Sequence, residues 1–221
     1  MKYEGKYIIL HKHIYGKMKK YLAFLLVAFL LLPVAARSAT YTVVFMGDSI
    51  TEVWLRDHAP FFNSNSYLGK GISGQTTAQM LKRFQSDVLN YQPKVVVILA
   101  GCNDVAQNKG YVAYEEIVEN ILRMGEVATE AGVKVAVISV LPTDYFFWNT
   151  ALKPAKQMRT LNAILEEKVI DAGYTWVDMY SALVVTDGAI DDMAAYDRLH
   201  PSVGGMEMME QIIQPYLEDL L

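Results

Sequence analysis

Short apolar runs rich in β-branched residues recur along the chain and limit the folds that it can adopt. The strongest run is KVVVILA at residues 94–100, and similar runs cover residues 41–46, 133–140 and 174–178. Strands that are apolar at every position are buried on both faces, as in a parallel sheet that helices cover on each side. The pattern therefore predicts an α/β protein with a parallel sheet between two layers of helices.

Stretches with helical spacing separate these runs. They cover residues 76–89, 114–131, 155–172 and 202–221, and a glycine directly follows the second and the third. Glycine is favoured just past a helix C-terminus, which supports these boundaries. In parallel sheets of this kind, ligands bind at the carboxyl ends of the strands. Functional residues are therefore expected directly after the apolar runs.

The first 39 residues have the features of a leader. Three lysines stand within residues 17–20, and residues 21–36 form a run of 16 almost entirely apolar residues closed by small ones. This run is shorter than the roughly 20 residues of a membrane-spanning helix, so we interpret it as a secretory signal peptide cleaved near Ala36. Met18 can begin such a signal by itself and is a candidate translation start. The alternative is an uncleaved N-terminal anchor.

Residues 40–221 form the single predicted domain, and its charge disfavours some partners. The leader holds seven of the 20 Lys and Arg residues and one of the 24 Asp and Glu residues, which leaves 13 basic against 23 acidic side chains. Such an acidic domain disfavours nucleic acid and anionic lipid as partners. We expect an exported protein, periplasmic or secreted, whose mature domain has no stable membrane insertion. Cys102 is the only cysteine, which excludes an intramolecular disulfide.

Three residues predict nucleophilic catalysis. Ser49 follows the first strand in a Gly-Asp-Ser turn, and Asp197 stands three residues before His200. A serine hydroxyl is a weak nucleophile unless a base takes its proton and a third group orients that base. The spacing can place the carboxylate against Nδ1 and leave Nε2 for Ser49. The alternatives are that Ser49 and Asp197 only cap helices. His58 is interpreted as a surface residue at a helix end.

Two further turns hold candidate donors for an oxyanion. Gly74 lies in a Gly-Ile-Ser-Gly turn, and Asn103 follows the strongest strand in a Gly-Cys-Asn-Asp segment. A backbone N–H and an Asn amide can both stabilise a developing oxyanion. Taken singly, a plain turn and an Asx turn are simpler interpretations. The segment around Ser49 lacks the G-x-S-x-G pattern of α/β-hydrolases, and no Gly-Lys-Ser/Thr follows Gly74, which excludes a P-loop.

Together these blocks resemble the SGNH, or GDSL-type, esterase/lipase family, named for its Ser, Gly, Asn and His. Ser49 matches its Gly-Asp-Ser block, Gly74 its Gly-Ile-Ser-Gly block, Asn103 its Gly-x-Asn-Asp block, and Asp197 with His200 its Asp-x-x-His-Pro block. The resemblance implies a flavodoxin-like three-layer α/β/α sandwich with a mostly parallel five-stranded sheet. It also implies Ser49 as nucleophile, His200 as base oriented by Asp197, and no metal or cofactor. The implied oxyanion hole consists of the Ser49 N–H, the Gly74 N–H and the Asn103 side chain.

Candidate substrate-binding residues lie beside these blocks. Four consecutive aromatics occupy residues 145–148, and they cannot all point into the core. We expect Trp148, with Trp54, to form a platform for a sugar ring or an aromatic leaving group, and Cys102 to narrow an acyl pocket. The alternatives are an aromatic lid packed on apolar neighbours and a buried cysteine that behaves as a small hydrophobe.

These observations predict a serine esterase that removes short acyl groups, acetyl above all, from small esters or acylated carbohydrate. A lysophospholipase or thioesterase on the same scaffold is an alternative, and so is a non-catalytic carbohydrate-binding domain. The complete Ser, Gly, Asn, Asp and His set disfavours the binding domain, which has no need of a base aligned with a nucleophile. The sequence leaves the oligomeric state open.

Overall fold

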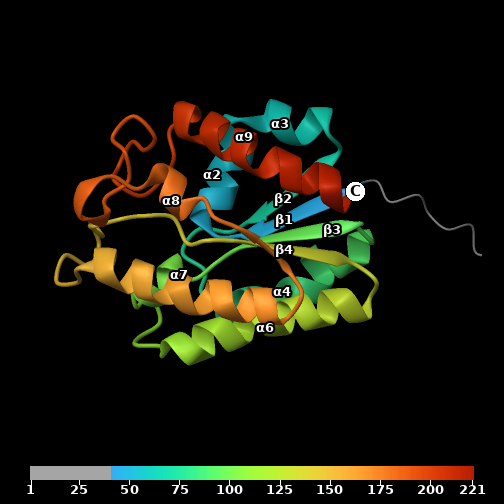
Figure 1. Ribbon diagram of the computed structural model, residues 1–221, viewed down its shortest axis with the longest axis horizontal. Coiled ribbons are helices and arrows are strands. Elements are labelled where there is room, and N and C mark those ends of the chain that lie inside the picture. The colour runs from blue at the N-terminus through green and yellow to red at the C-terminus, as the bar shows by residue number, and fades with distance from the viewer. Residues whose placement is uncertain (1–40) are drawn as a thin grey trace, which may run out of the picture. The chain divides into compact units, whose positions relative to one another are not determined.

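Five parallel strands form the sheet of the computed structural model, in the order β2-β1-β3-β4-β5 (Figure 1). They are β1 (Val43–Gly47), β2 (Tyr67–Gly71), β3 (Val95–Leu99), β4 (Lys134–Ile138) and β5 (Thr175–Val177), and every neighbouring pair is parallel. The structure describes residues 41–221. The predicted leader at residues 1–39, with its candidate start at Met18 and cleavage near Ala36, lies outside the described residues.

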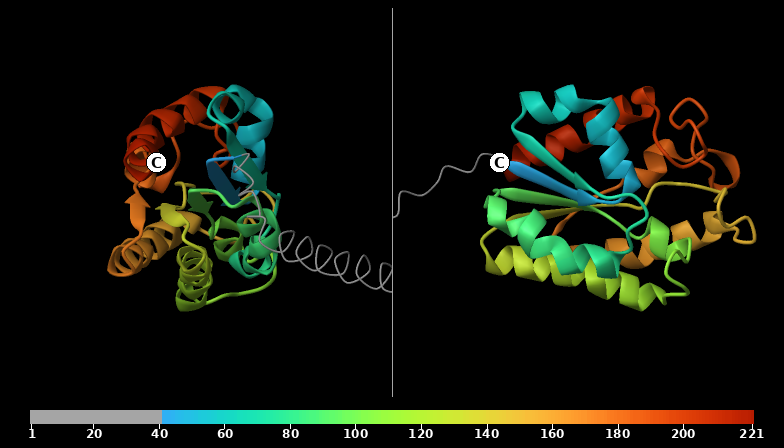
Figure 2. Two further views of the ribbon diagram at one scale, coloured as in Figure 1. Left: turned by 90° about the vertical axis from the view of Figure 1, so that its right-hand side faces the viewer. Right: turned by 180° about the vertical axis from the view of Figure 1, so that it is seen from behind.

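Helices cover both faces of the sheet (Figure 1, Figure 2). One layer contains α2 (Ser49–Asp57), α3 (Ala59–Ser64) and α9 (Val203–Leu220), and the other contains α4 (Thr77–Asp87), α6 (Tyr114–Glu130) and α7 (Pro154–Asp171). The short elements are α5 (Cys102–Val105), α8 (Tyr180–Leu183), η1 (Leu89–Tyr91) and η2 (Thr186–Gly188). The predicted three-layer α/β/α fold is confirmed. Within residues 41–221, no helix has the length and apolar character needed to cross a membrane.

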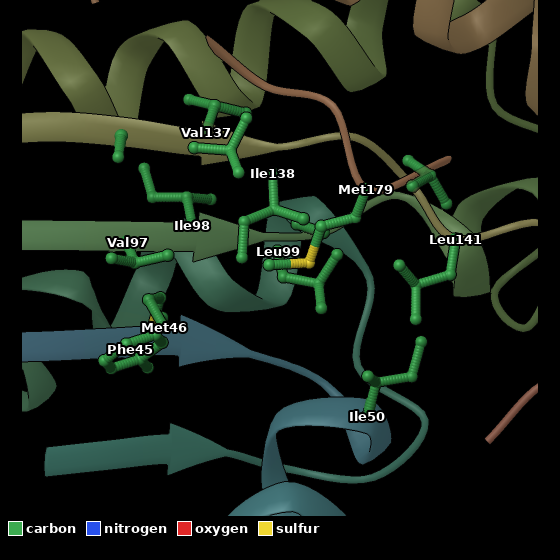
Figure 3. Close-up of a cluster of buried hydrophobic side chains, with 14 of the residues drawn as sticks. Phe45, Met46, Ile50, Val97, Ile98, Leu99, Val137, Ile138, Leu141 and Met179 are labelled. Atoms are coloured by element: carbon green, nitrogen blue, oxygen red, sulfur yellow. The ribbon is translucent and has the colours of Figure 1, made fainter. Parts of the chain in front are cut away.

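The apolar runs form the core because helices pack on both sides of them. Every residue of β1 and of β3 is buried. In Figure 3, Leu99 and Ile138, at the carboxyl ends of β3 and β4, lie close to Met179 from the segment that follows β5. Fully burying one such side chain stabilises a fold by about 1.5–3 kcal/mol, so this cluster anchors the strand ends that carry the functional residues.

Strand β2 is not predicted by the apolar pattern. Its sequence YLGKG contains two glycines and a lysine, and only Tyr67 is buried. The strand lies at the sheet edge and pairs only with β1, so it does not need to be apolar on both faces. Gly71 has a specific role here, because a Cβ on it would come within 2.1 Å of the backbone nitrogen of Glu52 in α2.

The strand order brings two distant segments together. β1 and β3 are neighbours, with Gly47 opposite Leu99, so the residues that follow each strand emerge side by side. The chain crosses to opposite sides of the sheet from this point, and parallel α/β sheets bind ligands at such a switch point. In Figure 2, the loop between α8 and α9 and the loop after β4 extend beyond the same end of the sheet.

Candidate functional site

Ser49, His200 and Asp197 lie in direct hydrogen-bonding contact. Ser49 Oγ is 2.8 Å from His200 Nε2, and His200 Nδ1 is 2.7 Å from Asp197 Oδ2. An ionised carboxylate can only accept, so Asp197 holds the imidazole proton on Nδ1 and leaves Nε2 to accept from the serine hydroxyl. This is the arrangement in which a histidine can remove a proton from a serine nucleophile.

The Asp197 carboxylate is oriented by its own turn. Its Oδ1 accepts hydrogen bonds from the backbone N–H groups of Leu199, at 3.2 Å, and His200, at 2.7 Å. The turn requires Arg198 in the left-handed region, with φ at 69°, a conformation that costs a non-glycine residue about 1 kcal/mol or more. The Arg198 guanidinium pairs with Asp144, which holds the turn against the loop after β4.

Ser49 is the first residue of α2, and Asp48 is its N-cap. The Asp48 carboxylate accepts from the Ile50 N–H at 3.0 Å, so Asp48 performs the capping role considered for Ser49. Gly47 permits this tight turn, because a Cβ there would lie 2.0 Å from Thr51 Oγ1. The Ser49 hydroxyl therefore sits at the positive end of the helix dipole and is free to contact His200.

Asn103 connects three of the sequence blocks. It is buried in α5, and its Nδ2 donates to Asp48 Oδ2 at 3.2 Å and to the Gln75 carbonyl at 3.1 Å. The Asx-turn interpretation is wrong, because Asn103 lies inside a helical turn. Gly74, next to Gln75, has φ at 76°, so the turn that carries its N–H favours glycine. Asn103 thus ties the turns around Asp48 and Gly74 to one another.

Burial strongly affects the acid beside the nucleophile. The Asp48 side chain is 1 % exposed, and burial raises its pKa from 3.8 to about 6, although the Ile50 N–H and the nearby His200 oppose the shift. Asp104 is also buried, accepts from the Thr77 hydroxyl at 2.7 Å, and has a pKa raised by burial. Carboxyl groups with raised pKa values often mark functional sites.

The raised pKa of Asp48 predicts a pH-dependent stability. Between pH 3.8 and about 6, the folded protein keeps a proton on Asp48 that the unfolded chain has lost, so stability falls as the pH rises through this range. The free energy of unfolding of wild type minus that of Asp48→Asn is expected to fall by about 2 kcal/mol from pH 4 to pH 7. Urea unfolding at each pH measures it. A difference that stays flat or rises with pH would contradict the expectation.

Two predicted substrate-binding residues are corrected by their burial. Trp54 is 1 % exposed, stacks on Phe61 at 5.3 Å between ring centroids, and donates its Nε1–H to Glu210 in α9 at 2.9 Å. Cys102 is 3 % exposed, and burial raises the pKa of its thiol well above the ordinary value. Trp54 therefore joins α2 to α9, and Cys102 is a core residue of α5, because both side chains face inward.

The aromatic loop after β4 divides between core and surface. Phe146 is fully buried, whereas Phe147 is 61 % and Trp148 39 % exposed. The Trp148 ring packs against Phe147, and its Nε1 donates to Asn108 Oδ1 at 2.8 Å. Of the predicted platform residues, Trp148 alone is placed where it can contact a ligand.

Three further residues, which no sequence motif predicted, also position the site. Asn108 donates to Asn103 Oδ1 at 2.7 Å. Glu52 accepts from the Ser73 N–H and hydroxyl and so attaches the turn before Gly74 to α2. Tyr196 stacks on the His200 ring with an interplanar angle of 15°. A lone Asn in a loop or an exposed Glu on a helix carries no sequence signal for such roles.

His58 takes part in a contact away from this cluster. Its Nδ1 lies 2.5 Å from Glu210 Oε1, the same oxygen that accepts from Trp54. The residue ends α2, as expected, but it is only partly exposed and helps attach α9. Among residues 41–221, no three His, Cys, Asp or Glu side chains are grouped so as to hold a metal ion.

Comparison with known proteins gives a family match over most of the chain. The model of the GDSL-like Lipase/Acylhydrolase family matches residues 45–208. A solved GDSL-like lipase from Bacteroides thetaiotaomicron VPI-5482 is 40% identical with a TM-score of 0.80, and the match covers 82% of this chain and 90% of that protein.

Two further similarities support less, one because its sequence identity is low and the other because it covers only part of the chain. An acetyl xylan esterase from Geobacillus stearothermophilus is 18% identical with a TM-score of 0.64, covering 80% of this chain and 93% of that protein, which shows a shared fold. The uncharacterized lipoprotein YqeF of Bacillus subtilis strain 168 is 36% identical over 78 residues, or 34% of this chain. The match spans about a third (32%) of that curated relative's length.

Proposed function

Because this chain belongs to the GDSL-like lipase/acylhydrolase family, we propose that it is a serine esterase that removes short acyl groups, acetyl above all, from carbohydrate. Family membership makes the chain an acylhydrolase that acts on small acyl esters. The observation that carries the proposed mechanism is the line of contacts from Ser49 Oγ through His200 to Asp197.

In the proposed first half-reaction, His200 Nε2 takes the proton of Ser49 Oγ while the oxygen attacks the ester carbonyl carbon. Asp197 stabilises the imidazolium that forms, because its carboxylate faces Nδ1. Collapse of the tetrahedral intermediate breaks the bond to the alcohol, and His200 gives the proton to that leaving oxygen. Ser49 then carries the acyl group, and a water deprotonated by His200 releases it in the second half-reaction.

The proposed oxyanion hole consists of the Ser49 N–H, the Gly74 N–H and the Asn103 amide. Both N–H bonds of Asn103 Nδ2 already have acceptors, Asp48 Oδ2 and the Gln75 carbonyl, at 3.2 and 3.1 Å. These bonds are at the long end of the normal range, so an oxyanion with full negative charge can share or replace one of them. Loss of one such donor typically costs ~10²–10³ in rate.

Two surface features support carbohydrate as the group that carries the acyl ester. Phe147 and Trp148 expose aromatic rings on the loop after β4, and sugar rings stack on such surfaces. A hollow of about 560 Å³ lies beside Arg198 and includes the acidic pair Asp191 and Asp192 in its lining. Hydroxyl-rich leaving groups suit this polar lining better than an aliphatic chain does. The likeness in fold to an acetyl xylan esterase agrees with this choice.

The test compares acyl chain lengths and natural polymers. We expect kcat/KM for p-nitrophenyl acetate to exceed that for the octanoate ester by at least about tenfold, and acetate to be released from O-acetylated xylan, since one extra methylene in a fitted pocket already changes discrimination by ~10-fold or more. A preference for octanoate would support the lysophospholipase or thioesterase alternative. Binding of xylan without hydrolysis of any ester would support a non-catalytic carbohydrate-binding domain.

A further inference from the structure

Asn108 lies behind the proposed oxyanion hole and contacts two of its parts. Its Nδ2 donates to Asn103 Oδ1 at 2.7 Å and approaches the Gly74 carbonyl at 3.4 Å. Its backbone N–H donates to the Asn103 carbonyl at 3.0 Å. One side chain thus links the residue that carries the amide donor to the residue that carries a backbone donor.

The remaining polar atom of Asn108 faces Trp148. Asn108 Oδ1 accepts from the indole Nε1–H at 2.8 Å. Because an indole nitrogen can only donate, the atom of Asn108 that faces it has to be the oxygen. Nδ2 of Asn108 is therefore turned toward Asn103, which must accept with its own oxygen. Nδ2 of Asn103 is then left on the side of Asp48 and the proposed oxyanion.

The loop that carries Trp148 is attached to the same segment a second time. Asn149 Nδ2 donates to the Ala106 carbonyl at 3.1 Å, just past α5. Trp148 is 39 % exposed, so the indole that orients Asn108 also faces solvent at the edge of the site. A ligand that packs on this ring contacts the group that sets the direction of the amide pair.

We propose that Asn108 is a positioning residue that fixes the direction of the Asn103 amide, and that the Trp148 N–H sets the direction of Asn108. The inference rests on the proposed esterase mechanism and deepens it, because it makes an exposed substrate-side aromatic a determinant of turnover. Asn108 acts through Asn103 and Gly74 and does not itself touch the reacting atoms. Its loss should therefore affect transition-state stabilisation more than substrate binding.

Three variants test this chain of contacts in p-nitrophenyl acetate hydrolysis. Since one oxyanion donor is worth ~10²–10³ in rate, we expect Asn108→Ala to lower kcat by about 10- to 100-fold with KM changed by less than about threefold. Trp148→Phe keeps an aromatic ring and removes only the N–H donor, and a loss of about 3- to 10-fold in kcat is expected. Asn90→Ala is the matched control, because Asn90 is an exposed Asn of η1 at the other end of the sheet.

Asn108→Asp provides a readout that a merely structural role would not change. Its ionised carboxylate can accept from Trp148 but cannot donate to Asn103, whereas the protonated form has one O–H to donate. The ratio of its kcat to that of wild type should therefore rise by about fivefold or more from pH 8 to pH 5, as the donor returns. Rescue at low pH identifies the donor to Asn103 as the functional part of Asn108.

The outcomes separate this inference from the proposed function. Suppose that Ser49→Ala is inactive while Trp148→Phe and Asn108→Ala keep kcat within twofold of wild type. The positioning role of Asn108 is then wrong, and the proposed esterase function is retained. The positioning role would also be wrong if the ratio of the kcat of Asn108→Asp to that of wild type did not change with pH. If Ser49→Ala is as active as wild type, both proposals fall. Should Asn108→Ala not fold, Trp148→Phe and the pH profile of Asn108→Asp decide.

Discussion

Replacing Ser49 with alanine is expected to abolish ester hydrolysis, lowering kcat for p-nitrophenyl acetate by about 10⁵-fold or more, as the loss of a serine nucleophile does in comparable triads. The Ser49 hydroxyl is the group that contacts His200 Nε2, and no other oxygen is placed on that nitrogen among the described contacts. The change removes one oxygen at the first residue of α2 and leaves the Asp48 cap in place. Stability should therefore stay close to that of wild type.

The matched control for this prediction is Ser86→Ala. Ser86 is an exposed serine of α4 whose hydroxyl bonds only locally, to the Arg83 carbonyl and Asp87. The Ser86→Ala variant should retain the kcat of wild type. Mass spectrometry after treatment with a serine-directed fluorophosphonate should place the adduct on Ser49 in wild type and find none in Ser49→Ala. Residual activity of one tenth or more in Ser49→Ala, with folding unchanged, would rule out Ser49 as the nucleophile.

Asp197→Asn should be the second most damaging substitution, lowering kcat by about 10³- to 10⁴-fold, the effect seen when the triad carboxylate becomes an amide. The amide oxygen can keep accepting from the Leu199 and His200 backbone N–H groups only if the amide NH₂ faces His200 Nδ1. Nδ1 would then have to accept, which places the imidazole proton on Nε2. In that tautomer His200 cannot take the proton of Ser49.

Asp197→Asn should lose turnover without losing the fold. Circular dichroism and urea unfolding should show Asp197→Asn close to wild type, because the backbone hydrogen bonds of its turn remain possible. Asp219→Asn, an exposed change in α9 with the same chemistry, should leave kcat as it is. Full activity in Asp197→Asn would mean that the carboxylate has no part in orienting the base.

The layered fold could be predicted because its signal is local. Residues 41–46, 94–100, 133–140 and 174–178 are mostly apolar. Three of the five strands lie within them, and β1 extends one residue beyond the first range. β2 has no such signal, since an edge strand with one partner tolerates two glycines and a lysine. The four-residue helix α5 was also not predicted, because a single turn is shorter than one full helical repeat of apolar positions.

The direction and the burial of individual side chains could not be predicted from the sequence. Trp54 and Trp148 were predicted together as a platform, yet Trp54 is 1 % and Trp148 39 % exposed. The difference arises because Trp54 packs on Phe45 of β1 and Phe61 of α3, and donates to Glu210 of α9, more than a hundred residues further along the chain. Periodicity within a helix shows which residues share a face, but the element that covers that face is chosen by the tertiary fold.

The sequence was enough to predict the layer pattern, the family and the residues from which a site can be built. Apolar strands and short motifs are patterns of residues that are neighbours in the chain, so they can be recognised without a structure. Only the tertiary structure supplied the geometry of the predicted contact between Ser49 and His200, 151 residues apart, and the link that Asn108 makes between Asn103 and Trp148. Those contacts depend on the order of β1 and β3 in the sheet and on where the loops after β4 and α8 fold back. Hydrogen bonds between such segments form only once packing has placed both ends.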